Sequence, residues 1–350
     1  MAIQALKGSG RQLPASRFVV PGLGLVISLV AAWLAVQGVD LATVGELLGR
    51  VDPGILVLAI CFVGFELWVR ALRWSLLLPP GPSGRPSTGR LVPVALVGYL
   101  GNTVLPARIG DVLMAVLASR RESVPVAGAL GSVVLMRVFD TLALALLVFP
   151  AAIIAGAPEG LIRAAGVAAV LAAAVLLFAQ TSIPASIIGF ARRRIRWAPA
   201  TALLDHGVRF LEAMSGKGRV PVFAAAMTLT LGIWILEATV YWLTALSLNV
   251  GLTPAAALLV AAVAVLGTAV PSAPGYVGTF ELAASTLARA LGVEPSAALA
   301  YAILVHAVTA LPLAIGGVVA MAWLGIGPGA LRRSTSVSAD PHPAAAEEPR

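Results

Sequence analysis

Charged and amide side chains interrupt one of the most apolar parts of the chain. The stretch GNTVLPARIGD places Asn102, Arg108 and Asp111 close together. Arg137 and Asp140 follow in the next apolar run, three residues apart, a spacing that puts them on one face of a helix. Ionisable groups at membrane depth cost about 2.5–3.5 kcal/mol each on insertion scales, so we treat these residues as functional candidates. A guanidinium grips a phosphate through two parallel hydrogen bonds, so the chemistry indicated is binding of an anionic group.

The stretch PSAPGYVGTFE forms a second polar break between two apolar runs. Proline removes a backbone donor and clashes with the preceding turn, so we expect Pro271 and Pro274 to end a descending half-helix. Gly275 and Gly278 permit a tight reversal, after which an ascending half-helix would begin with Glu281 in its first turn. The amides at the start of such a helix are suited to binding an anion.

The composition indicates that the chain folds in a membrane. Of its 350 residues, 59% are hydrophobic and 11% are charged, and the mean hydropathy is +0.96, whereas soluble domains carry about 25% charged residues. We therefore expect an all-α polytopic membrane protein. The net charge of +8 then reports on topology and not on nucleic acid, because Lys and Arg concentrate in cytoplasmic loops. The single cysteine, Cys61, excludes an intramolecular disulfide.

Eight apolar segments can be separated along the chain. Six are uninterrupted, and each is long enough to cross a bilayer as one helix: 18–37, 54–78, 126–150, 161–180, 221–248 and 296–324. The other two, 91–117 and 254–290, are broken in the middle by proline and glycine. We expect six full transmembrane helices plus two re-entrant helical hairpins.

Charge placement favours hairpins that enter and leave on the same side of the membrane. With that topology most of the 24 lysines and arginines, including the run ARRRIRW, share one side with both termini, and the positive-inside rule makes that side cytoplasmic. The order span, span, hairpin, span then occurs twice in opposite orientation, an inverted repeat typical of secondary transporters. FELWVRALRW is echoed by ILEATVYW, and Pro106-x-x-x-Gly110 by Pro274-x-x-x-Gly278. Coincidence in a chain rich in Ala, Leu and Val is the alternative explanation of these echoes.

This topology divides the chain into parts. We expect a cytoplasmic N-terminus at 1–17, a first repeat half at 18–155, a second half at 161–325 and a disordered cytoplasmic tail at 326–350. Within the second half, 189–219 is expected to lie on the cytoplasmic surface, either attracting anionic headgroups or serving as a topology anchor. The expected location is the cell membrane, plasma or inner.

The ionisable residues at membrane depth lead to a binding hypothesis. Two arginines and the hairpin amides are expected to hold the phosphate of a lipid headgroup in a central cavity, while acidic residues balance charge or engage other parts of the headgroup. The expected headgroup-binding residues are Arg108, Arg137, Asn102, Asp111, Asp140, Glu237 and Glu281. The residues expected to shape the hairpins are Pro106, Gly110, Pro271, Pro274, Gly275 and Gly278.

These assignments have purely structural alternatives. The pairs that would then only fix helix packing are Arg137–Asp140, Arg108–Asp111 and, near the membrane interface, Glu66–Arg70. For His306, a hydrogen bond in the core is the favoured interpretation, and a proton relay is the alternative.

Four motifs in sequence order resemble the membrane region of the lysylphosphatidylglycerol synthases. They are R-x-x-R-W at 70–74, N-x-x-x-P-x-R-x-G-[DE] at 102–111, R-x-x-D at 137–140 and P-S-x-P-G-x-x-G-x-x-E at 271–281. The resemblance covers nearly all of 18–325, and stand-alone members of that family are called flippase-like domain proteins. Asp111 and Tyr276 depart from the family, which more often has Glu and a second Gly at these positions.

The resemblance implies lipid handling. In multidomain relatives this region is linked to moving aminoacylated phosphatidylglycerol across the bilayer, and a separate cytosolic domain performs the aminoacyl transfer. We expect no such domain after the last span, so the resemblance argues against synthase activity by this chain alone. Some relatives accompany polyprenyl-linked sugar pathways, which leaves the lipid open.

The expected function is that of a flippase-like protein, which binds and translocates an anionic phospholipid or a polyprenyl-phosphate-linked lipid without ATP. The alternative is a membrane subunit or scaffold of a lipid-modifying or glycosyl-transfer enzyme. The sequence has no Walker A, G-x-S-x-G or H-E-x-x-H motif and no Cys cluster, so we expect no enzyme activity, cofactor or metal. The expected partner is a membrane lipid with a phosphate headgroup. A cytosolic lipid-modifying enzyme and a homodimer stay open as partners, and nucleic acid is not expected.

Overall fold

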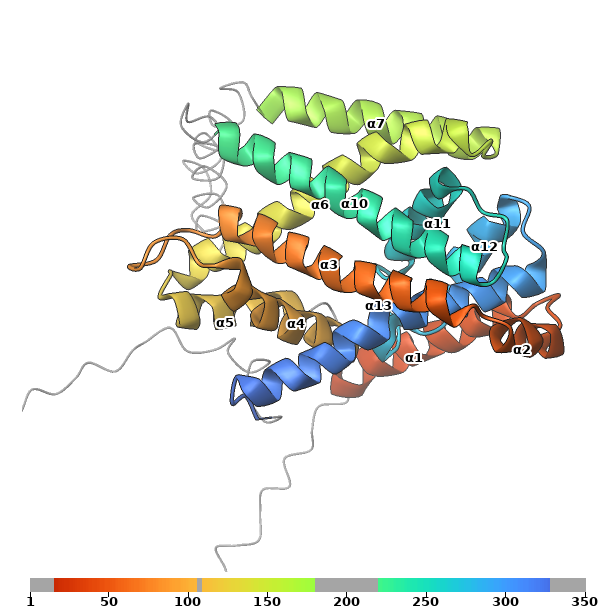
Figure 1. Ribbon diagram of the computed structural model, residues 1–350, viewed down its shortest axis with the longest axis horizontal. Coiled ribbons are helices and arrows are strands. Elements are labelled where there is room, and N and C mark those ends of the chain that lie inside the picture. Colours follow the sequence, from red (N-terminus) through yellow and green to blue (C-terminus); the bar gives the residue numbers. More distant parts are fainter. Residues whose placement is uncertain (1–15, 106–108, 180–219, 328–350) are drawn as a thin grey trace, which may run out of the picture.

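The computed structural model describes residues 16–105, 109–179 and 220–327. Regular secondary structure in these residues is helical (Figure 1), as expected from the sequence. In chain order the helices are α1 (Ser16–Ala35), α2 (Leu41–Gly49), α3 (Pro53–Leu77), α4 (Thr88–Val104), α5 (Ile109–Glu122), α6 (Val126–Ile154), α7 (Glu159–Ala179), α10 (Val220–Ser247), α11 (Pro254–Gly267), the 3₁₀ turn η2 (Pro274–Tyr276), α12 (Thr279–Ala290) and α13 (Pro295–Trp323). Pro106, Arg108 and the segment 189–219 lie outside the described residues, as do most of the two termini.

Four of the described helices, α3, α6, α10 and α13, are long and apolar enough to cross a membrane. The shortest of them, α3, has 25 residues. At about 1.5 Å per residue it spans about 38 Å, which exceeds the ~30 Å hydrocarbon core of a bilayer. The segment Gly22–Ala35 of α1 and the whole of α11 are shorter apolar helices. The chain is therefore a membrane-spanning helical protein.

Acidic caps define where two of the long helices begin. The Asp52 carboxylate accepts hydrogen bonds from the backbone nitrogens of Gly54 and Ile55 at 2.8 and 3.1 Å, and proline follows as the first residue of α3. Glu294 caps α13 in the same way, again with proline next in the chain. These caps satisfy the first backbone donors, which a helix cannot pair internally.

The first broken segment folds as two antiparallel helices, α4 and α5, packed along each other (Figure 1). Glycines allow this close approach. A Cβ on Gly110 would collide with the carbonyl oxygen of Gly98 and the backbone nitrogen of Asn102, and a Cβ on Gly101 would lie 2.8 Å from the Cα of Gly110. Gly110 therefore shapes this segment as expected from the sequence.

The second broken segment consists of α11, η2 and α12, with α11 packed against α12. Gly275 and Gly278 have φ values of 77° and 90°, a conformation that glycine adopts without strain. Gly278 directly precedes α12, and Glu281 lies in the first turn of that helix, as predicted. The descending helix differs from the prediction. It ends at Gly267, before Pro271, and Pro274 instead begins the 3₁₀ turn.

Helices from distant parts of the sequence pack in pairs. α3 and α10 pack along each other (Figure 1), α4 packs against α13, and α11 packs against α6. The largest buried apolar cluster of the described residues joins α6 and α7 with α10 to α13, and a second joins α3 to α6. α2, which the apolar pattern did not predict, is a short helix that packs against α13.

Candidate functional site

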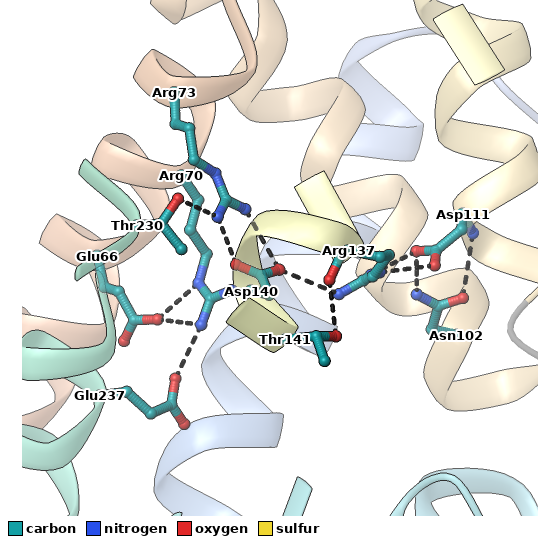
Figure 2. A network of polar contacts seen from close by, with 10 residues as sticks. All are labelled: Glu66, Arg70, Arg73, Asn102, Asp111, Arg137, Asp140, Thr141, Thr230 and Glu237. Carbon is teal, nitrogen blue, oxygen red and sulfur yellow. Dashed lines mark hydrogen bonds and ion pairs between the residues drawn. The ribbon is translucent and has the colours of Figure 1, made fainter. Parts of the chain in front are cut away.

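Arg70 links α3 to α10 through two carboxylates (Figure 2). Its Nε donates to Glu66 Oε1 one turn earlier on α3 at 2.6 Å, and a terminal nitrogen donates to Glu237 Oε2 on α10 at 3.0 Å. The side chains of Glu66 and Glu237 are only 6% and 13% exposed. Buried charges are costly unless they are paired, so this arrangement stabilises all three groups in the interior.

Arg73, one turn further along α3, is the most buried of the three guanidinium groups in Figure 2. It forms an ion pair with Asp140 on α6, and its Nη1 donates to Thr230 Oγ1 on α10 at 3.0 Å. The Arg73 side chain is 3% exposed. Thr230 in turn donates to the Ala226 carbonyl at 2.7 Å. The Arg73 guanidinium therefore joins α3, α6 and α10.

Arg137 on α6 extends the network to the first hairpin (Figure 2). Its Nε and Nη2 donate to the two carboxylate oxygens of Asp111 on α5 at 3.1 and 2.7 Å. Asn102 on α4 donates to Asp111 Oδ1 at 2.8 Å and accepts from the Asp111 backbone nitrogen at 3.1 Å. Arg137 also lies 3.8 Å from Asp140. Ion pairs and hydrogen bonds thus connect five helices.

The charges of this network nearly balance. It contains the guanidinium groups of Arg70, Arg73 and Arg137 and the carboxylates of Glu66, Asp111, Asp140 and Glu237. With every group ionised, these described residues carry one net negative charge. Carboxylates already pair with all three guanidinium groups, so an incoming anion competes with them. The Arg137 side chain, at 38% exposed, is the most accessible of the three guanidinium-bearing side chains.

Two hollows on the described residues lie elsewhere. An open, apolar groove of about 630 Å³ lies between α6 and α7 and is lined by residues that include Phe149, Arg163 and Val170. A smaller cavity of about 280 Å³ is lined by the loops that follow α10 and α12. Neither lies at the charge network, so neither is the central cavity expected from the sequence.

Glu281 belongs to a separate polar centre. Its Oε1 lies 2.5 Å from His306 Nδ1 on α13, and its Oε2 accepts from the Gly278 backbone nitrogen at 2.6 Å. The ring of Phe280 stacks on the His306 imidazole with centroids 4.2 Å apart. The expected hydrogen bond of His306 is therefore present, and its partner is the acidic residue at the start of α12.

A hydrogen bond between described residues joins the two broken segments. The Tyr276 hydroxyl donates to the Asn102 backbone carbonyl at 3.0 Å. Asn102 also holds Asp111, so the 3₁₀ turn of the second segment contacts the residue that orients the carboxylate partner of Arg137. The two polar centres are therefore in structural contact.

The structure gathers most of the residues expected at the site. Those found in the network of Figure 2 are Asn102, Asp111, Arg137, Asp140 and Glu237. Glu281 lies in the second centre, and Arg108 lies outside the described residues. The sequence hypothesis left out Glu66, Arg70, Arg73, Thr230 and His306 as site members. A signal for three of them was present, because positions 66, 70 and 73 recur at the spacing of one helix face.

A polytopic helical membrane protein with a connected set of buried charges is the class that this fold and site define. The chain belongs to the family described as the lysylphosphatidylglycerol synthase TM region, whose model matches residues 22–317, which confirms the resemblance drawn from the motifs. It is also similar to the glycosyltransferase AglD of Haloferax volcanii, with 26% identity over 340 residues. That match covers 87% of this chain and 54% of the relative, so the chain spans about half the length of the relative.

Proposed function

We propose that this protein binds and translocates an anionic phospholipid or a polyprenyl-phosphate-linked lipid across the cell membrane without ATP. The observation that carries the proposal is the network of three guanidinium groups and four carboxylates shared by five helices, four of which also pack directly as the pairs α3–α10 and α4–α5. Ionisable groups inside membrane helices are expensive and mark ion or substrate pathways by default. Membership of a family named for a lipid synthase supports a lipid as the substrate.

Arg137 is the proposed contact for the lipid phosphate. It is more exposed than Arg70 and Arg73, and it already makes the two parallel hydrogen bonds that a phosphate would accept. A phosphate that displaces Asp111 from Arg137 also frees Asp111 to rotate against Asn102. Headgroup binding would therefore loosen the contact between α6 and the first hairpin, and this coupling is the proposed start of translocation. Arg108 stays a proposed second contact.

We also propose the full topology of six spans and two re-entrant hairpins in an inverted repeat, with both termini cytoplasmic. Three packing relations support it, because the pair α4–α13 mirrors the pair α11–α6 and α3 packs on its proposed counterpart α10. A second similarity concerns the ion pairs. In each half, the third residue of the ascending half-helix, Asp111 or Glu281, bonds a cationic or basic residue eleven positions into the next helix, Arg137 or His306.

Reconstitution tests the proposal. Purified protein is placed in vesicles that contain a fluorescent phospholipid, and the fraction of lipid reaching the opposite leaflet is followed by quenching with an impermeant reagent. Loss of a charged hydrogen bond costs about 1.5–3 kcal/mol, so Arg137→Ala is expected to slow translocation about ten- to hundredfold. Arg163→Ala is the matched control, because it also removes an arginine ion pair, with Glu159, outside the network. Equal rates for wild type and Arg137→Ala would contradict the assignment.

A second function is favoured by one observation. The relative AglD is named as a glycosyltransferase, so the chain could be the membrane subunit or scaffold of a glycosyl-transfer enzyme. Such a subunit would bind a polyprenyl-phosphate sugar without moving it. Vesicles loaded with a fluorescent polyprenyl-phosphate sugar distinguish the two. Binding without translocation favours the subunit, and translocation favours the transporter.

A further inference from the structure

The pair Glu281–His306 is a second buried acid–base pair, outside the network of Figure 2. Glu281 is the third residue of α12 and His306 the twelfth of α13, and their side chains are 14% and 13% exposed. We infer that His306 is a proton-binding site that couples lipid translocation to proton movement. This inference rests on the proposed function and identifies its coupling ion.

The geometry fixes the orientation of the imidazole. Glu281 is held at one oxygen by the Gly278 backbone nitrogen and presents the other to His306 Nδ1. Phe280 stacks on the ring with an interplanar angle of 21°. No hydrogen bond of His306 Nε2 is found within the described residues, so this nitrogen is the position at which a proton can be gained or lost.

The role of the pair Glu281–His306 is indicated by comparison with the pair Asp111–Arg137. Both pairs join the third residue of an ascending half-helix to a residue eleven positions into the next helix. Arg137 is a permanent cation. His306 is a cation only when protonated, because histidine changes charge within the physiological pH range. The pair therefore carries one net negative charge without the proton and is neutral with it.

The elements packed around this pair carry other titratable side chains, but none of those in the described residues forms an ion pair with Glu281 or His306. α11 and the Gly22–Ala35 part of α1 carry none. On the remaining elements packed against α12 and α13, they are Glu46, Cys61, Glu66, Arg70, Arg73, Arg90, Tyr99, Glu237, Tyr241, Tyr276, Arg289 and Tyr301. Arg289 donates to the carbonyls of Ala35 and Gln37 at the end of α1. Within the described residues, Glu281 and His306 form an ion pair only with each other.

Coupling follows from this charge difference. A proton that binds His306 Nε2 creates an imidazolium, which can receive the phosphate that leaves Arg137 as Glu281 turns aside. Without the proton, the negative pair repels the phosphate. The proton then leaves from Nε2 to the water on the side where the lipid is released. One proton therefore accompanies one lipid phosphate, and no bond other than N–H forms or breaks.

A pH gradient across the vesicle membrane tests this coupling. A gradient of one pH unit corresponds to about 1.4 kcal/mol per proton, so coupled movement shifts the ratio of labelled lipid between leaflets by up to about tenfold. Wild type is expected to accumulate labelled lipid in the leaflet toward which protons move down their gradient. His306→Gln is expected to give a ratio of labelled lipid between leaflets near one. Thr309→Val is the matched control in α13 and is expected to keep the shift, since among the described residues the Thr309 hydroxyl donates to the backbone carbonyls of Val305 and His306. A wild-type leaflet ratio that is the same with and without the pH gradient would overturn the inference but would not contradict translocation itself.

A second measurement does not depend on transport. Full-length protein with His206→Gln and His342→Gln retains His306 as its single histidine, which nitrogen-15 NMR can observe in nanodiscs. The His306 ring signals are expected to change as a proton binds, and this change is expected to be altered in Glu281→Gln. An unresponsive ring would overturn the proton site even if lipid moved. A responsive ring with no lipid movement would retain the proton site and contradict the proposed transport.

Discussion

The Tyr276 hydroxyl donates to the backbone carbonyl of Asn102, so the 3₁₀ turn of the second broken segment is bonded to the last turn of α4, in the middle of the first. These residues come from opposite halves of the chain. Asn102 also orients Asp111, the partner of Arg137. The bond therefore lies between the two polar centres and is suited to relaying a change at one of them to the other.

Tyr276→Phe is expected to remove the hydrogen bond to Asn102 and to lower the free energy of unfolding by about 1 kcal/mol. Tyr301→Phe is the matched control, because its hydroxyl also donates to a backbone carbonyl, that of Tyr241, at 3.1 Å. Thermal unfolding in detergent compares the two variants. We expect similar losses of stability but a change in lipid translocation only for Tyr276→Phe. A change of the same size in both variants would show that the bond has only a structural role.

Arg73→Met is expected to be strongly destabilising, because it leaves the buried Asp140 carboxylate without its closest cation, and its remaining ion-pair partner among the described residues is Arg137 at 3.8 Å. Removing one partner of a buried pair typically costs about 3–5 kcal/mol. The double variant Arg73→Met/Asp140→Leu removes both charges and should recover much of that loss. Arg50→Ala, which removes an exposed ion pair with Glu46, is the control and should change stability by less than about 1 kcal/mol. Equal unfolding of the double and single variants would contradict this explanation.

Gly278→Ala is expected to disturb the second hairpin. The residue has φ of 90°, and a Cβ would collide with the Ser28 carbonyl oxygen on α1. The loss of stability should be about 2 kcal/mol or more, because backbone strain and collision add, at about 1 kcal/mol or more for each. Gly64→Ala on α3 has nothing within 4 Å of the new methyl group. That control should leave stability unchanged or raise it by up to about 1 kcal/mol. Unfolding midpoints of the two variants provide the comparison.

Cysteine labelling tests whether the first broken segment returns to the side it entered. In a Cys61→Ser background, Ser83→Cys precedes α4 and Arg121→Cys lies near the end of α5, and both residues are exposed. We expect an impermeant maleimide to reach both sites only after the cells are opened. Glu46→Cys in α2, a residue whose side chain is 69% exposed, should react in intact cells. Labelling of Ser83→Cys and Arg121→Cys from opposite sides would mean that this segment crosses the membrane.

Local sequence determined the class of the fold and the position of its elements. Apolar runs longer than a bilayer requires predicted the spanning helices, and prolines with glycines predicted the breaks, because these residues restrict the backbone wherever they occur. The same local rules placed Glu281 in the first turn of α12. These rules did not predict the end of α11 correctly. The helix ends at Gly267, before Pro271, and the hydroxyl of the next residue, Thr268, donates to the Val265 carbonyl.

Only the tertiary structure decided which charges pair. Spacing along one helix suggested Arg137 with Asp140, yet Arg137 makes its closest contacts with Asp111 on α5, and Asp140 pairs with Arg73 on α3. Glu281 likewise pairs with His306 on another helix. Spacing fixes which residues share a helix face. The partner of that face depends on how each helix is rotated and how deeply it sits, and the packing of the whole helix set determines both.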